Sequence, residues 1–308
     1  MNLLHTLLMF YMPIVLGFLL KKIGIIRESD AQPLVAYVVY VALPCLILES
    51  FGIQSLNKVW NLAICMMIFS LVTQLASLGA ILVIVNAFCS DLDNKTKGVA
   101  VLAASFQNTA FLPLPIVISI WGDAGVTAVV FYMLINGLLM NTIGAFIAAS
   151  FSGNFTSLRE ILRSTLSYPP MVISILGLIL LVSPWTMGET IRRILAFMGD
   201  TTVPVILFTI GLRLRFDISS IRAFASVYFI VMFVRFFFSP LLNIALINYA
   251  YVSEAMMRSI IILEAGMPPA VMNSVLAEKY ELNKELMSNL IPILTSFSLV
   301  LIPLWLMF

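Results

Sequence analysis

Two short polar clusters, each beside a pair of prolines, interrupt apolar stretches of this chain. The residues are Asn108 and Thr109 with Pro113 and Pro115, and Asn273 with Pro268 and Pro269. Amide and hydroxyl groups can bind a carboxylate, or coordinate an ion through oxygen. We therefore predict that Asn108, Thr109 and Asn273 bind substrate. Asn273 could instead bridge two helices, and Gln107 could face a neighbouring helix.

The prolines predict breaks in the helices that carry these clusters. A proline removes one helical N–H bond and crowds the carbonyl four residues earlier. In hydrocarbon an unpaired carbonyl costs several kcal/mol, so irregular backbone is expected only inside protein or beside a wet cavity. The carbonyls freed in this way would be those of Thr109, Phe111, Glu264 and Ala265. We expect the broken helices to line the site; ordinary proline kinks are the alternative.

Two ionisable residues, Arg235 and Glu264, lie deep within apolar runs. A lone charge at mid-membrane costs at least about 2.5 to 3.5 kcal/mol on insertion scales, so each should have a partner or a bound ion. Arg235 could neutralise Glu264, bind a substrate carboxylate, or do each in alternate states. Glu264 is also the candidate for coupling transport to Na⁺ or H⁺.

Composition indicates a membrane protein, because 61% of residues are apolar, 10% are charged and mean hydropathy is +1.07. About 17 to 25 apolar residues cross the hydrocarbon core as a helix. Ten such runs lie near residues 3–20, 33–52, 59–88, 98–121, 125–150, 168–184, 191–212, 223–250, 256–277 and 287–308. We therefore predict an all-α polytopic protein with ten transmembrane helices.

The positions of lysine and arginine predict the orientation, because basic loops stay cytoplasmic. Twelve of these residues lie in loops after odd-numbered runs and four in loops after even-numbered runs. Both termini should therefore lie outside the plasma (inner) membrane. The net charge of +2 reflects this bias, and no dense basic run suggests a nucleic-acid partner.

Proline spacing suggests an internal repeat. Pro204 follows Pro44 by 160 residues, and Pro268 follows Pro113 by 155. The predicted parts are a five-helix repeat over 1–150, a short cytoplasmic linker over 151–167 and a second five-helix repeat over 168–308. Because five is odd, the second repeat must be inverted. Inverted repeats with broken helices in matching positions are typical of transporters with a site near the midplane.

Three motifs, NTAFLPLPIVISIWGD, GMPPAVMNSVLAEKYEL and TVPVILFTIGLRL, resemble the auxin efflux carrier family, within the larger bile-acid, arsenite and riboflavin transporter superfamily. The resemblance covers essentially the whole chain, and the short linker suggests a compact prokaryotic-type member. It implies that the fourth and ninth helices cross as broken helices at their prolines. It also implies a scaffold of helices 1, 2, 6 and 7, often dimeric, and a moving domain of helices 3–5 and 8–10. Family substrates are mostly small organic anions such as carboxylates.

Motifs of soluble enzymes are absent from the sequence, including G-x-S-x-G, H-E-x-x-H and a Walker loop. We therefore predict no catalytic residue, no metal site and no cofactor beyond a coupling ion. The prediction is a secondary transporter that moves small organic anions by an elevator-like, alternating-access mechanism. An intramembrane enzyme and a membrane sensor or scaffold that has kept a carrier fold are the alternatives.

Overall fold

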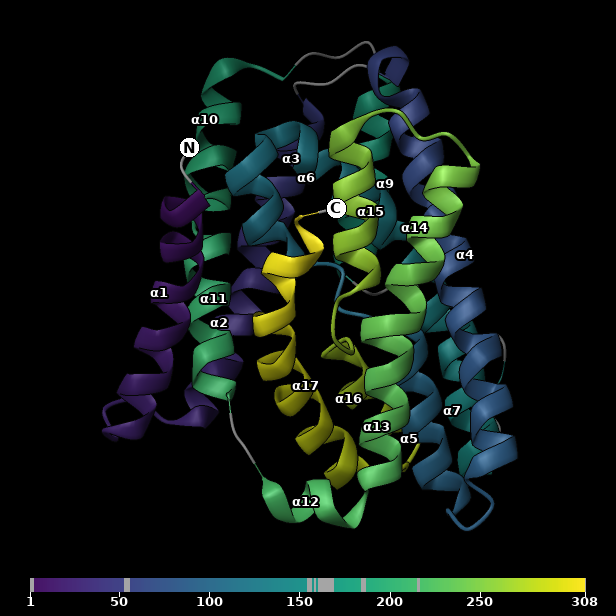
Figure 1. The fold of residues 1–308 in the computed structure, drawn as a ribbon. Coiled ribbons are helices and arrows are strands. Elements are labelled where there is room, and N and C mark those ends of the chain that lie inside the picture. The colour runs from purple at the N-terminus through teal and green to yellow at the C-terminus, as the bar shows by residue number, and fades with distance from the viewer. Residues whose placement is uncertain are drawn as a thin grey trace. The chain divides into compact units, whose positions relative to one another are not determined.

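The protein is all-helical (Figure 1). The computed structural model describes residues 3–52, 56–153, 157, 159, 169–183, 187–214 and 217–307, so most of the expected 151–167 linker lies outside the described residues. The described residues contain no strand beyond one isolated bridge. Six described helices are long and apolar enough to cross a membrane: Glu28–Gly52, Val59–Phe88, Pro113–Ser152, Glu189–Arg213, Ala225–Tyr249 and Lys284–Trp305.

The chain forms two compact units, and each unit combines segments from both halves of the sequence. Unit 1 contains Met1–Met66, Ala110–Leu134 and Leu166–Leu214. Unit 2 contains Met67–Thr109, Ile135–Thr165 and Arg215–Phe308. Neither unit is therefore a continuous half of the chain such as 1–150 or 168–308.

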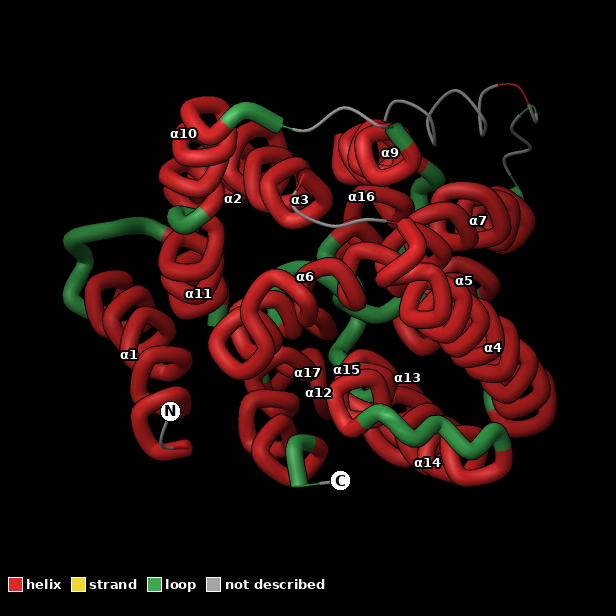
Figure 2. Tube along the Cα trace, turned by 90° about the horizontal axis from the view of Figure 1, so that it is seen from above, coloured by secondary structure: helices red, strands yellow, loops and turns green. Residues whose placement is uncertain are grey.

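Unit 1 is built from helices near the start of the chain and helices from its middle. They are α1 (Leu3–Lys22), η1 (Glu28–Asp30), α2 (Ala31–Tyr37), η2 (Val38–Ala42), α3 (Leu43–Gly52), α9 (Pro169–Val182), α10 (Glu189–Gly199) and α11 (Thr202–Arg213). Within this unit α1 packs along α11, while α3 packs against α9 and α10 (Figure 2). Arg192 on α10 forms an ion pair with the buried Glu49 on α3 at 3.4 Å.

Glycines allow α1 and α11 to approach closely. A Cβ atom on Gly17 would meet the carbonyl oxygen of Phe208, and one on Gly211 would meet that of Ile14. In membranes, small residues at helix contacts let backbones pack together. The close contact of α1 with α11 therefore depends on glycine, which has no side chain, at positions 17 and 211.

We predict that Gly211→Ala destabilises the protein, because α1 must shift to admit the methyl group, at a cost of about 1 to 3 kcal/mol. The apparent melting temperature of the purified protein measures this. Gly79→Ala on α4 is the control, since a Cβ there has nothing within 4 Å and alanine favours a helix. Equal melting temperatures for the two variants would contradict the prediction.

Two helices are divided between the units. Residues 56–66 of α4 (Leu56–Phe88) and 113–134 of α6 (Pro113–Leu139) belong to unit 1, and the rest of each belongs to unit 2. The other helices of unit 2 are α5 (Asn94–Ser105), η3 (Met140–Gly144), α7 (Ala145–Ser152), α12 (Ile218–Ala223), α13 (Ala225–Phe233), η4 (Val234–Phe238), α14 (Ser239–Tyr249), α15 (Ala255–Ala265), α16 (Met272–Lys279) and α17 (Lys284–Trp305). The helix α6 is kinked at Gly122, where φ is 58°.

The helix α5 lies at the centre of unit 2 and packs against α7, α13 and α17. Asp93 begins it, because its carboxylate accepts hydrogen bonds from the backbone N–H of Thr96 at 3.0 Å and the Thr96 hydroxyl at 2.7 Å. These bonds hold the pKa of Asp93 below its usual range. Every residue from Gly98 to Ser105 is buried, so α5 ends inside protein.

Candidate functional site

Two helices of unit 2, α5 and α15, end inside the protein. The first break follows α5 at Ser105, and α6 begins at Pro113. The second break follows α15 at Ala265, and α16 begins at Met272. In Figure 1, α15 and α16 lie one beyond the other, with the second break between them.

The prolines take different places in the two breaks. Pro113 is the first residue of α6, where a missing N–H removes no helical bond. Pro115 lies in the same first turn. The expected interruption therefore lies before Pro113 rather than at it. Pro268 and Pro269, in contrast, lie within the second break itself.

The two breaks pair with each other as short antiparallel backbone segments. Gln107 and Pro269 form an isolated bridge. The Asn108 N–H donates to the Pro268 carbonyl at 2.8 Å, and the Ala270 N–H donates to the Phe106 carbonyl at 2.9 Å. Each break thus supplies hydrogen bonds that the other has lost from its helix.

Asn273 connects α16 to the end of α5. Its Nδ2 donates to the carbonyls of Phe106 at 2.9 Å and Leu102 at 3.3 Å, and the side chain is fully buried. Each of these carbonyls also accepts a backbone hydrogen bond, that of Leu102 from the Phe106 N–H and that of Phe106 from the Ala270 N–H. The Oδ1 of Asn273 has no hydrogen-bond partner among the described residues. The nitrogen of Asn273 therefore bridges two helices.

Asn136 plays a similar part from α6, and the sequence reasoning missed it. Its Nδ2 donates to the Gln107 carbonyl and to the Thr109 hydroxyl, both at 3.2 Å. The side chain is buried, and its Oδ1 has no hydrogen-bond partner among the described residues. An amide side chain inside the apolar run 125–150, which also contains Asn141, was the available signal. Asn108 and Thr109 are themselves 6% and 4% exposed.

Arg235 contacts both breaks from η4. Its Nη1 donates to the Gln107 Oε1 at 2.9 Å and to the Ala104 carbonyl at 3.1 Å, and its Nη2 donates to the Ala265 carbonyl at 2.7 Å. Gln107 thus faces a neighbouring helix through its side chain. No ion pair joins Arg235 to Glu264 in the described part of the chain.

Glu264 lies in the last turn of α15, directly before the second break. Its side chain is fully buried, and neither carboxylate oxygen has a hydrogen-bond partner among the described residues. Its backbone carbonyl accepts from the Met267 N–H at 3.2 Å, while that of Ala265 accepts from Arg235. The expectation that Pro268 and Pro269 leave these two carbonyls free is therefore wrong, because a turn and a guanidinium satisfy them.

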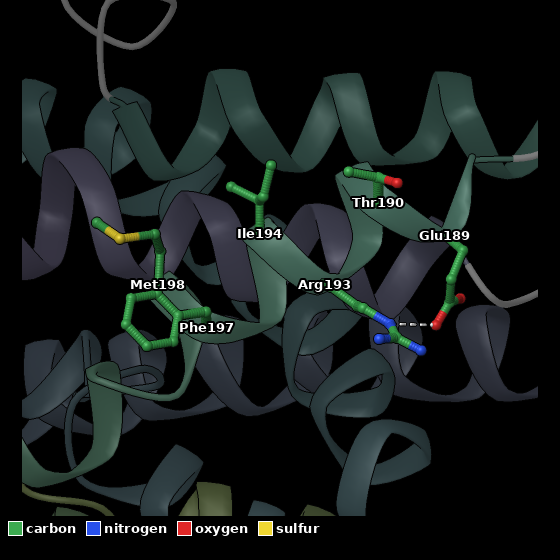
Figure 3. Close-up of a pocket in the computed structure, with 6 residues that line it drawn as sticks. All are labelled: Glu189, Thr190, Arg193, Ile194, Phe197 and Met198. Atoms are coloured by element: carbon green, nitrogen blue, oxygen red, sulfur yellow. Dashed lines mark hydrogen bonds and ion pairs between the residues drawn. The ribbon is translucent and has the colours of Figure 1, made fainter.

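A pocket of about 470 Å³ lies elsewhere, along α10 of unit 1 (Figure 3). Its lining residues are Glu189, Thr190, Arg193, Ile194, Phe197 and Met198. Arg193 is bound to Glu189 at 2.8 Å, and Phe197 is 75% exposed. One face of a single helix does not surround a ligand, so the paired breaks are the better candidate site.

These features define a class: an all-helical membrane protein with a polar, hydrogen-bonded crossing of two broken segments. A family model described as a membrane transport protein matches residues 2–306. The chain therefore belongs to this membrane transport family, the auxin efflux carrier family that its motifs resemble, and that prediction is confirmed.

Two archaeal relatives carry the name of uncharacterized transporter. One, from Methanothermobacter thermautotrophicus, is 31% identical over 307 residues, covering 98% of this chain and 96% of the relative. Another, from Methanocaldococcus jannaschii, is 25% identical over 297 residues, covering 95% and 94%. Family and relatives are transporters and not enzymes, so this chain is a membrane transporter.

We predict that Asn273→Ala destabilises unit 2, because the carbonyls of Phe106 and Leu102 each lose one of two donors and the side-chain bridge from α16 to α5 is lost. A hydrogen bond contributes a net stabilisation of about 0.5 to 1.5 kcal/mol. The melting temperature of the purified protein should fall, and that of Ser274→Ala, a half-buried neighbour on α16, should not. If both variants melt with the wild type, the bridging bonds of Asn273 contribute nothing to stability.

Proposed function

We propose that the protein is a secondary transporter for small organic anions such as mono- or dicarboxylates. The observation that carries this proposal is the crossing of the two breaks. The buried amide residues Asn108, Asn136 and Asn273 lie in or are bound to this crossing, together with Thr109. The amide N–H of Asn108 and the hydroxyl of Thr109 are donors of the kind that a carboxylate accepts, while the Nδ2 atoms of Asn136 and Asn273 donate to the crossing itself.

The half-helices that follow the breaks favour an anion. The N-terminal end of a helix carries free N–H groups equivalent to about +0.5 charge. The helices α6 and α16 begin directly after the two breaks, at Pro113 and Met272. Within unit 2, a carboxylate held by Asn108, whose backbone N–H is bound to the Pro268 carbonyl, would meet the positive potential of α16. We leave Arg235 out of the proposed ligand contacts, because both of its terminal nitrogens donate to backbone carbonyls or to Gln107.

The contacts within unit 2 support the proposal of two inverted five-helix repeats. Residues related by a two-fold axis touch each other only close to that axis. Gln107 and Pro269 are 162 residues apart, and so are Ser77 and Ser239, whose hydroxyls lie 2.8 Å apart. The same offset relates the two hydrogen bonds beside the bridge. Asn108 and Ala270, the two donors, are 162 residues apart, and so are Phe106 and Pro268, the two acceptors. The same offset at two separate contacts supports ten helices with broken helices four and nine.

We further propose that the carrier works by alternating access, with an elevator-like motion of helices 3–5 and 8–10 against a scaffold of helices 1, 2, 6 and 7. Both termini would lie outside the plasma membrane, and the carrier would be a homodimer. The absence of a nucleotide-binding motif from the sequence supports coupling to an ion gradient or to the substrate gradient itself.

Glu264 is the proposed coupling residue. A buried carboxylate without a donor favours binding of a proton or a cation, and Na⁺ and H⁺ both meet this requirement. Glu264 lies in the last turn before the second break, so binding of an ion to its carboxylate would affect the backbone of that break. Substrate binding and ion binding would then act on the same backbone segment.

The test of function is a thermal-stability screen of purified protein against mono- and dicarboxylates, with and without sodium, because selective binding stabilises the folded state. Compounds that stabilise the protein are then tested for uptake into proteoliposomes. Uptake of a stabilising anion supports the carrier. Stabilisation without flux would favour a sensor that has kept a carrier fold, and no response to any anion would contradict the proposal.

We predict that Asn108→Ala weakens substrate affinity about ten- to hundredfold, since a hydrogen bond to a charged ligand contributes roughly 1.5 to 3 kcal/mol. Folding should be largely retained. Phe111→Ala should show the reverse order, with lower stability and residual transport per folded molecule. Uptake normalised to monodisperse protein separates the two, and wild-type uptake by Asn108→Ala across substrate concentrations would refute its role.

We predict that Glu264→Gln abolishes gradient-driven accumulation while it retains substrate exchange, because glutamine keeps the shape of the side chain without its charge. Uptake measured with a sodium gradient, and separately with a proton gradient, identifies the ion. Glu254→Gln is the control, since Glu254 is exposed before α15. Accumulation by Glu264→Gln with the wild-type gradient dependence would overturn the coupling role.

A further inference from the structure

A single guanidinium joins the ends of two broken helices. Arg235 lies in the π-helical turn η4, Val234–Phe238, and its side chain is fully buried. Such π-helical turns are rare in proteins, and those that occur often lie at functional sites. The charge of Arg235 is therefore placed deep inside unit 2 at a point where the helix geometry is locally widened.

The contacts of Arg235 fall on the carboxyl ends of both interrupted helices. Nη1 donates to the Ala104 carbonyl in the last turn of α5, and Nη2 donates to the carbonyl of Ala265, the last residue of α15. Each helix end carries a partial charge of about −0.5. One arginine thus offsets two helix ends, in addition to its electrostatic interaction with Glu264.

The third contact is with the side chain of a residue that belongs to the paired backbone. Nη1 also donates to the side chain of Gln107, the residue that bridges to Pro269. Arginine has five donors in a rigid planar fork, whereas lysine is a flexible point charge. A lysine at this position would keep the charge but would not span two helix ends and a side chain in one plane.

We propose that Arg235 is a positioning residue that clamps the two breaks together and thereby fixes Asn108 and Asn273 for ligand binding, without touching the ligand. The clamp itself follows from the contacts within unit 2 and needs no ligand. Its consequence for affinity rests on the proposed transport of an anion at the crossing. The two statements can therefore be tested separately.

The clamp is tested by hydrogen–deuterium exchange of the purified protein without ligand. In Arg235→Lys, exchange should accelerate by roughly tenfold or more in both segments that the clamp holds, near residues 104–110 and 264–272, because local opening becomes easier. Asn243→Ala is the matched control. It removes another buried polar contact of unit 2, to Thr73 at 3.0 Å, and should leave both segments protected. Unchanged exchange in Arg235→Lys, or acceleration in one segment only, overturns the clamp.

A second variant keeps the test decisive if Arg235→Lys does not fold. Gln107→Ala removes one contact of the guanidinium and leaves its charge in place. It should accelerate exchange at both segments, more weakly than Arg235→Lys. Full protection in Gln107→Ala, or acceleration equal to that in Asn243→Ala, overturns the proposal.

Rescue separates positioning from general destabilisation. In Arg235→Ala, added methylguanidinium should restore protection of both segments, whereas methylammonium at the same concentration should not, because only the planar fork reaches both helix ends. If the two ions have the same effect on hydrogen exchange, the result counts against the clamp. If the exchange results hold but no anion binds, the clamp stands and the transport proposal fails.

Once a transported anion is identified, the effects of Arg235→Lys on KM and on the maximal rate can be compared. We expect the factor by which KM rises to be at least about ten times the factor by which the maximal rate falls, because a displaced binding group weakens affinity first. Methylguanidinium should lower the KM of Arg235→Ala again. An unchanged KM in Arg235→Lys together with loosened segments would show that the clamp does not position the ligand-binding residues.

Discussion

Backbone hydrogen bonding inside an apolar medium is the constraint on which this structure depends. A helix that stops within the protein leaves carbonyl and N–H groups without partners, each at a cost of several kcal/mol in hydrocarbon. The two breaks of unit 2 meet that constraint by pairing with each other through Asn108 with Pro268 and Ala270 with Phe106. The crossing is therefore a small antiparallel sheet contact inside an all-helical protein.

Three buried side chains add hydrogen bonds to the paired backbone. Arg235, Asn136 and Asn273 all donate, and most of their acceptors are backbone carbonyls at or near the breaks. Their donors are committed to the fold, while the oxygens of Asn136, Asn273 and Glu264 have no donor among the described residues. Asn136 and Asn273 thus hold the crossing together through their nitrogens, and their oxygens are not used in these bonds.

The hydrogen bonds of the crossing are internal to one compact unit. Every residue that donates or accepts in the bonds described above belongs to unit 2. The tight contact of α1 with α11, made possible by Gly17 and Gly211, lies within unit 1. The hydrogen bonds of the crossing and the glycine contact of α1 with α11 are thus each internal to one unit.

The sequence by itself determined the class of the protein, because hydrophobic runs and family motifs are local properties of the chain. It also pointed to Asn108, Asn273 and the proline pairs, since polar groups and prolines in apolar runs require an explanation. The position of the first break, the role of Arg235 and the presence of Asn136 at the crossing were decided by tertiary structure. These depend on which carbonyls, far apart in sequence, come within reach of one donor, and hydrophobic patterning carries no record of that pairing.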